Sequence, residues 1–173
     1  TVKNTDRFVH TWDGELYLEY HRGTYTSQGY NKRMNRKMEL LYRTAEWLTA
    51  MGSVREGRLE LAEQEKLTEG WKRILTNQFH DIIPGSSIHE VYEDARKDYE
   101  TIKNIGKDVI RDYLEKSLEK DETSYTVYNA SGWDTDEIAA VPQTALGVYT
   151  DGKGTVLTSQ QGQGVTYVLV KNV

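Results

Sequence analysis

The chain has 173 residues, enough for one domain or two small ones, and its formal net charge of −5 argues against a nucleic-acid-binding protein, whose phosphate contacts need a basic surface. It contains no cysteine, which excludes a disulfide framework and a zinc site built from thiolates. No apolar run approaches the roughly 20 residues that span a bilayer, and the first residues lack the apolar core of a signal peptide, so we expect no membrane partner. The absence of cysteine is consistent with the cytoplasmic location that we expect.

Residues 1–30 are rich in aromatic residues and glycine, and we expect them to form an extended lead-in with short strand or turn elements. Four tyrosines and one arginine of this segment could stack on a sugar ring, although such aromatic residues more often belong to an interface or a core. They are Tyr17, Tyr20, Tyr25, Tyr30 and Arg22.

From about Asn31 the apolar residues recur at spacings of three and four, which is typical of one face of a helix. This first stripe consists of Met34, Met38, Leu41, Ala45 and Leu48. Gly52 stands where a helix C-terminal glycine would be expected. Basic residues crowd the start of this helix, either as a solvated face or as a surface that docks on an acidic partner: Lys32, Arg33, Arg36 and Lys37.

Two further helices are expected. One begins near Leu59 and has an apolar face made of Leu67, Trp71, Ile74, Leu75 and Phe79. The other begins near Ile88, where Ser87 and Glu90 fit a capping box, and its face comprises Tyr92, Ala95, Tyr99, Ile102, Val109 and Tyr113. Gly106 lies on that face and predicts close backbone packing, because glycine otherwise costs about 1 kcal/mol in a helix. Residues 31–120 are therefore predicted to form a three-helix bundle.

After about Asp121 the pattern changes to short strand candidates separated by turn compositions. The candidates are SYTVYN, DEIAAVP, TVLTSQ and VTYVLVKNV. We interpret residues 121–173 as the truncated opening of a β-domain, so the predicted fold class is mainly α with a β appendage. Asn129 begins an Asn-Ala-Ser sequence that we interpret as a turn rather than a glycosylation site. Because the alternation stops at Val173, open strand edges predict a homo-oligomer.

One dipeptide could carry chemistry. His80 and Asp81 follow the second helix and precede Pro84-Gly85, which end it. Imidazole is a common zinc ligand, and a carboxylate can orient a sugar hydroxyl. These residues alone favour a structural role, with His80 near the negative end of a helix and Asp81 as a cap of the turn. A zinc site needs three or four ligands, and His10, His21 and His89 have no ligand-like spacing to His80.

The blocks GELYLEYHRGTYTSQGYNKRMNRKMELLYRTAEWL and NQFHDIIPGSSIHEVYEDA resemble glycoside hydrolase family 38, the α-mannosidases, and in particular their bacterial branch. The segment YTVYNASGWDTDEIAAVP is similar to the start of the C-terminal β-domain of that family. The resemblance implies a middle helical domain whose N-terminal catalytic barrel is absent from this chain. Residues 1–30 would be the lead-in from that barrel.

The resemblance also implies a zinc-dependent, retaining enzyme that cleaves terminal α-mannosides. His80 would be one zinc ligand, Asp81 would contact the mannose hydroxyls, and the catalytic carboxylates would lie in the barrel, with none in this chain. Two alternatives stay open: a mannosyl-glycerate hydrolase of the same family, and a helical interaction module without a catalytic role. The chain by itself is expected to be inactive.

Overall fold

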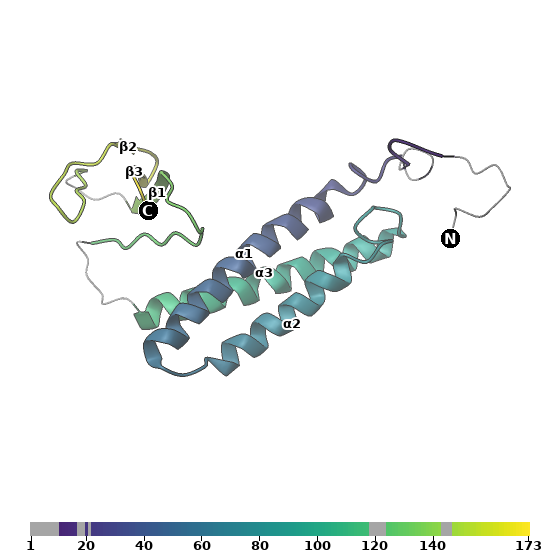
Figure 1. Cartoon of the computed structure of the whole chain (residues 1–173), viewed down its shortest axis with the longest axis horizontal. Coiled ribbons are helices and arrows are strands. Elements are labelled where there is room, and N and C mark those ends of the chain that lie inside the picture. The colour runs from purple at the N-terminus through teal and green to yellow at the C-terminus, as the bar shows by residue number, and fades with distance from the viewer. Residues whose placement is uncertain (1–10, 17–19, 21, 118–123, 143–146) are drawn as a thin grey trace. The chain divides into compact units, whose positions relative to one another are not determined.

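The computed structural model describes residues 11–16, 20, 22–117, 124–142 and 147–173. Three helices are followed by three strands (Figure 1): α1 (Gly29–Glu56), α2 (Leu61–Asn77), α3 (His89–Ser117), β1 (Glu137–Pro142), β2 (Ser159–Gln161) and β3 (Val165–Val170). The expected fold class, mainly α with a β appendage, is confirmed. The three domain ranges expected from the sequence stay predictions. No described helix is long and apolar enough to cross a membrane.

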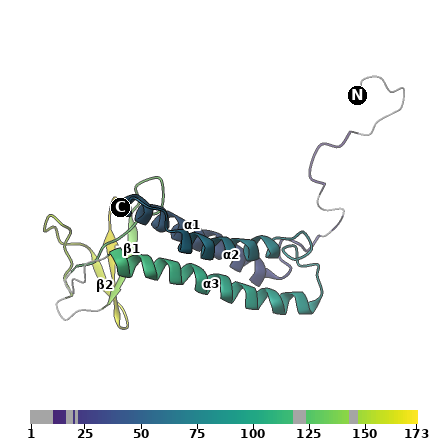
Figure 2. The ribbon, with the colours of Figure 1, turned by 90° about the horizontal axis from the view of Figure 1, so that it is seen from below.

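The chain divides into two compact units. The first comprises the described residues of Thr1–Tyr42 and Glu65–Gly106, and the second those of Arg43–Gln64 and Lys107–Val173. Each helix therefore contributes a segment to each unit. In the first unit the three helical segments run alongside one another in both views (Figures 1 and 2).

The core of the first unit comes from all three helices, because each turns an apolar stripe toward the others. Its buried apolar side chains are Met38, Tyr42, Leu67, Ile74, Tyr92, Ala95, Tyr99 and Ile102. The stripe predicted for α2 is wrong at two positions, since Leu75 is 60% exposed and Phe79 is 52% exposed. Successive helical residues point about 100° apart, so Leu75 turns away from the core that Ile74 enters, and Phe79 lies beyond the last residue of α2.

Two glycines allow the helices of this unit to approach closely. The close packing predicted at Gly106 is confirmed, because a Cβ atom there would lie 2.8 Å from Cδ2 of Leu41. Gly70 is buried in α2, and a Cβ atom there would overlap the ring of Tyr42. The bulk of Tyr42 thus occupies the space that a side chain at position 70 would need.

Tyr42 is fully buried, and its hydroxyl donates a hydrogen bond of 2.9 Å to the carbonyl oxygen of Ile102. Burial raises the pKa of Tyr42 to about 12, against a smaller opposing effect of the Arg73 charge. The folded chain therefore holds this proton at pH values where the unfolded chain, with a tyrosine pKa near 10, has released it. The stabilisation is complete below about pH 10 and is lost as the pH rises toward 12.

We accordingly expect the free energy of unfolding to fall between about pH 10 and pH 12, and Tyr42→Phe to make that fall shallower. At neutral pH the substitution should cost about 1 kcal/mol, the usual net value of one hydrogen bond. Urea unfolding followed by circular dichroism at several pH values measures both effects. Burial also raises the pKa of Tyr99 to about 12, so Tyr99→Phe should make the fall shallower as well, and an unchanged slope in Tyr42→Phe would contradict the assignment.

The helical part of the second unit corrects the predicted end of the first helix. The helix α1 continues through Gly52 to Glu56 and ends before Gly57, which has a φ of +64°. A left-handed residue of this kind terminates many helices. Gly52 instead makes room for an aromatic ring, because a Cβ atom there would lie 3.1 Å from Cε2 of Tyr113.

The strands form one antiparallel sheet with the order β1-β3-β2. In β1–β3 the register pairs Glu137 with Val170 and Pro142 with Val165. Among the described strands, β1 and β2 each pair on one side only. This leaves the open edges on which the predicted self-association depends, and the self-association itself stays a prediction.

Two of the predicted strands differ in the structure. The segment SYTVYN is not a strand, and the ring of Tyr128 instead meets those of Trp47 and Tyr113 edge to face. The segment TVLTSQ contributes an isolated bridge at Val156 and only the beginning of β2. Asn129 lies in a turn as predicted, because the amide of Ser131 donates to Oδ1 of Asn129 at 2.8 Å.

Candidate functional site

His80 and Asp81 lie in the turn between α2 and α3, three and four residues beyond the last helical residue, Asn77. Their side chains are 77% and 60% exposed. Nε2 of His80 is 3.5 Å from Oδ2 of Asp81, and the imidazole ring lies 4.2 Å from the ring of Phe79. Both functional groups are therefore open to solvent on the same side of the turn, beside an exposed aromatic ring.

The backbone of this turn is held by its own hydrogen bonds. The amides of Ile82 and Ile83 donate to the carbonyl oxygen of Phe79 at 2.8 and 3.0 Å. The hydroxyl of Ser87 donates to the carbonyl oxygen of Asp81 at 2.6 Å. This differs from the predicted capping box, in which Ser87 would have accepted a hydrogen bond from α3. The Ser87 side chain therefore closes the turn instead of capping the helix.

The turn also rests on the segment before α1. Gly85 has a φ of +95°, and a Cβ atom there would lie 2.7 Å from Cβ of Ser27 and 2.9 Å from its carbonyl oxygen. Only glycine fits this conformation and this approach without strain. The blocks HRGTYTSQ and FHDIIPGSS, which stand far apart in the sequence, thus meet in one place.

A lysine ties these two blocks together. Nζ of Lys32 donates to the carbonyl oxygen of Ser27 at 2.6 Å and to that of Ile83 at 2.7 Å. Burial lowers the pKa of Lys32 from its ordinary value. The solvated basic face expected at the start of α1 is therefore wrong for Lys32, whereas Arg33, Arg36 and Lys37 are exposed as that interpretation expects.

The beginning of the turn is fixed as firmly as its end. Nε2 of Gln78 donates to Oδ1 of Asn35 and to Oε1 of Glu39, both at 2.9 Å. The preceding residue, Asn77, is buried and donates to Oδ2 of Asp98 at 3.3 Å. The chain thus enters the turn from a position that side chains on both α1 and α3 determine.

A capping role for the Asp81 carboxylate does not fit this geometry. Within the described part of the chain, the Asp81 carboxylate makes no hydrogen bond to a backbone amide, and the carbonyl oxygen of Asp81 accepts the bonds that hold the turn. His80 lies three residues beyond Asn77, the last residue of α2, and a favourable interaction with the macrodipole stays an alternative role for it.

His80 could bind zinc only together with ligands from elsewhere. His80 offers an exposed imidazole, the donor that zinc prefers in proteins together with thiolate and carboxylate. No three His, Cys, Asp or Glu side chains among the described residues are grouped so that they could hold a metal ion. His89 contacts Glu93 at 3.3 Å, and His10 and His21 lie outside the described residues. Further ligands would have to come from another part of a longer protein.

The aromatic residues of the lead-in are only partly placed. Tyr17 lies outside the described residues, and Tyr20 and Tyr25 are 77% and 71% exposed. Tyr30 meets Tyr99 edge to face, and the guanidinium of Arg96 lies 4.1 Å from the centre of its ring. Tyr30 is therefore engaged within the first unit, where it stabilises the packing of α1 on α3.

The family of the chain follows from a comparison with known proteins. Residues 19–116, which include all of α1 and α2 and almost all of α3, match the family model described as the alpha mannosidase middle domain. The chain belongs to this family. The match includes the turn with His80 and Asp81, which is therefore a feature of a middle domain.

Curated relatives of this middle domain carry matching names. Alpha-mannosidase of Saccharomyces cerevisiae is 43% identical over 83 residues, covering 48% of this chain and 8% of the relative. Alpha-mannosidase 2C1 of Mus musculus is 33% identical over 135 residues, covering 77% of this chain and 13% of the relative. The chain thus spans only 8% and 13% of the lengths of these two relatives.

A solved structure has the same fold. A protein in the glycosyl hydrolase family 38 from Enterococcus faecalis superposes with a TM-score of 0.66 at 19% sequence identity. The match covers 88% of this chain and 24% of that chain. The arrangement of helices and strands described above therefore recurs within a longer protein.

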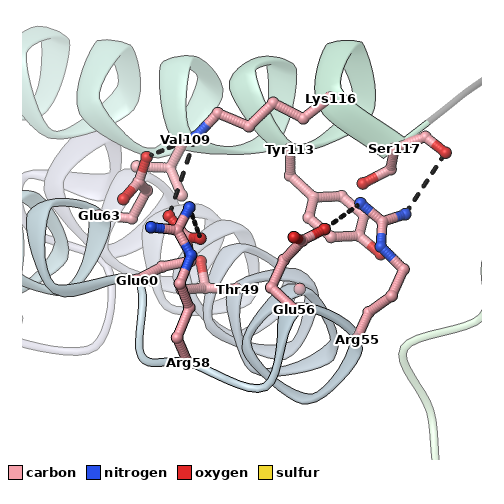
Figure 3. Close-up of a pocket in the computed structure, with 11 residues that line it drawn as sticks. Thr49, Arg55, Glu56, Arg58, Glu60, Glu63, Val109, Tyr113, Lys116 and Ser117 are labelled. Carbon is pink, nitrogen blue, oxygen red and sulfur yellow. Dashed lines mark hydrogen bonds and ion pairs between the residues drawn. The ribbon is translucent and has the colours of Figure 1, made fainter.

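Sequence reasoning missed a pocket in the second unit (Figure 3). Its volume is about 230 Å³, and charged side chains of both signs line it together with Tyr113. Those charges pair with one another: Nζ of Lys116 is 3.1 Å from Oε1 of Glu63, and Nη2 of Arg58 is 3.4 Å from Oε1 of Glu60. The mutual pairing leaves no excess charge that would select a ligand.

Proposed function

We propose that this chain is the middle part of a zinc-dependent, retaining α-mannosidase that cleaves terminal α-mannosides in the cytoplasm. His80 is one ligand of the zinc ion, and Asp81 contacts hydroxyl groups of the sugar. The observation that carries the proposal is the pair of exposed side chains on a turn whose backbone is fixed from several sides. The family and the names of the relatives support the substrate class.

The residues of this chain bind and orient the zinc ion and the sugar. The exposed imidazole of His80 offers a ring nitrogen, and it contacts the Phe79 ring and the Asp81 carboxylate. The carboxylate oxygens of Asp81 accept hydrogen bonds from sugar hydroxyls. Zinc, when bound, supplies a positive charge that attracts hydroxyl oxygens of the substrate.

The bond-breaking groups belong to the proposed N-terminal catalytic barrel. Retaining glycosidases use two carboxyl groups about 5–5.5 Å apart, one as nucleophile and one as acid and base. We assign neither group to this chain. The turn would complete a site whose other ligands and carboxylates the barrel supplies, so the middle domain and the barrel share one active site.

The proposal is tested with the longer protein that carries this chain. That protein should release p-nitrophenol from a p-nitrophenyl α-mannoside, lose the activity when zinc is removed by a chelator, and regain it when zinc is restored. The 173-residue chain alone should show no turnover and bind zinc only weakly, because one imidazole and one carboxylate do not fill a tetrahedral shell. Turnover that survives complete removal of zinc would contradict the metal role.

A further inference from the structure

Three side chains of α1 grip the turn that carries His80 and Asp81. Lys32, Asn35 and Glu39 are three and four residues apart, so they lie on one face of the helix. Lys32 holds the turn just after the dipeptide, at Ile83. Asn35 and Glu39 hold it just before the dipeptide, at Gln78.

The contact after the dipeptide places a lysine ammonium in an unusual, partly buried environment. The Lys32 ammonium donates to two carbonyl oxygens, of Ser27 and of Ile83, and is partly removed from water. A lysine on a helix surface ordinarily keeps its charge in solvent. Its cost of desolvation is offset here by two short hydrogen bonds from a charged donor, which are stronger than neutral ones.

The contact before the dipeptide is a closed set of hydrogen bonds. The amide group of Gln78 donates to Asn35 and Glu39, and Nδ2 of Asn35 donates to the same Oε1 of Glu39 at 3.1 Å. Each member restricts the rotamers of the other two, so the Gln78 side chain has one favoured position. The four residues from Phe79 to Ile82 therefore lie between two residues, Gln78 and Ile83, that are hydrogen-bonded to side chains of α1.

We propose that Lys32, together with Asn35 and Glu39, is a clamp that positions His80 and Asp81 for the metal and the sugar. The clamp residues bond to Ser27, Ile83 and Gln78 and not to His80 or Asp81, so they are positioning residues. Functional groups must be held within about 0.5 Å of their working geometry, and a solvent-exposed turn without such support samples more conformations than that. The inference rests on the proposed function, because it assumes that the dipeptide binds zinc and sugar.

The test compares variants of the longer protein by titrating the metal-free form with zinc. Lys32→Met keeps the length of the side chain and removes its charge. We expect zinc affinity to fall about 10–100-fold, as it does when a group that orients a metal-binding side chain is removed. Lys32→Arg keeps the charge and the donors, so it should recover most of the affinity. Lys37→Met, at an exposed position on the same helix, is the control and should bind zinc like the parent.

Amide hydrogen exchange distinguishes positioning from general destabilisation. In Lys32→Met we expect the amides of Ile82, Ile83 and Gly85 to exchange at least about tenfold faster while those in the middle of α3 keep their protection. Faster exchange throughout the helices would overturn the positioning role. If Lys32→Met does not fold, Gln78→Met removes the other contact, leaves the lysine in place, and should give the same two effects.

The clamp and the proposed function fail in different ways. If His80→Ala loses zinc while both Lys32→Met and Gln78→Met bind it as tightly as Lys37→Met, the clamp is wrong and the proposed function stands. If His80→Ala keeps normal zinc and a normal rate, the proposed function is wrong, and the clamp, which depends on it, is overturned as well.

Discussion

In the longer protein, His80→Ala should abolish both zinc binding and mannosidase activity. The substitution removes one of the three or four bonds that hold a catalytic zinc ion. We expect activity to fall by more than the roughly 10–100-fold that is typical when a residue that contacts a metal ligand, and not the metal itself, is substituted. Zinc content per folded molecule and the rate of p-nitrophenol release measure the two losses together, after circular dichroism has shown that the variant folds.

The chain offers a matched control for this experiment. His89 is 80% exposed and contacts Glu93, much as His80 is exposed and contacts Asp81. His89→Ala should therefore keep its zinc and its rate. Asp81→Asn, which keeps the shape of the side chain but removes its charge, should lose activity and retain zinc. A folded His80→Ala protein that matches His89→Ala in both measurements would return His80 to a purely structural role.

The second large effect is expected at Gly70. Gly70→Ala places a methyl group where the Tyr42 ring lies, although the same change in an open helix stabilises by about 1 kcal/mol. Displacing a fully buried ring costs about 1–3 kcal/mol, occasionally more, and weakens the hydrogen bond from Tyr42 to Ile102. We therefore expect a lower urea midpoint for the 173-residue chain.

Gly29→Ala is the control for that measurement. Gly29 is also helical, but no atom lies within 4 Å of a Cβ added there. This variant should be as stable as the parent or slightly more stable. A Gly70→Ala chain that gains stability like Gly29→Ala would show that α2 and α1 do not approach each other as closely as described.

The helices were predictable because their stripes repeat over many turns, as in the stripe from Tyr92 to Val109. Their ends were less so. Gly52 suggested the end of α1, yet it serves packing on Tyr113, and the terminating residue is Gly57. Local composition does not show which glycine meets a ring from a distant helix. The same limit made SYTVYN look like a strand, although its Tyr128 packs on helical aromatic residues.

The candidate site was predictable only in part. His80 and Asp81 were identified through the resemblance to a family, since their spacing alone also fitted a structural role. The clamp was missed because its contacts join residues far apart in the chain: Lys32 and Ile83 are separated by 51 positions, and Asn35 and Gln78 by 43. A basic residue near a helix start gives no sign of the carbonyl oxygens that it reaches.

The most direct test of the central claim is the position of zinc in crystals of the longer protein, located by anomalous scattering at the zinc absorption edge. The account predicts a zinc peak about 2.0–2.1 Å from a ring nitrogen of His80, the usual zinc–nitrogen distance, with the Asp81 carboxylate facing the space beside it. A zinc ion coordinated entirely by other residues, with the His80 imidazole left in solvent, would contradict the account.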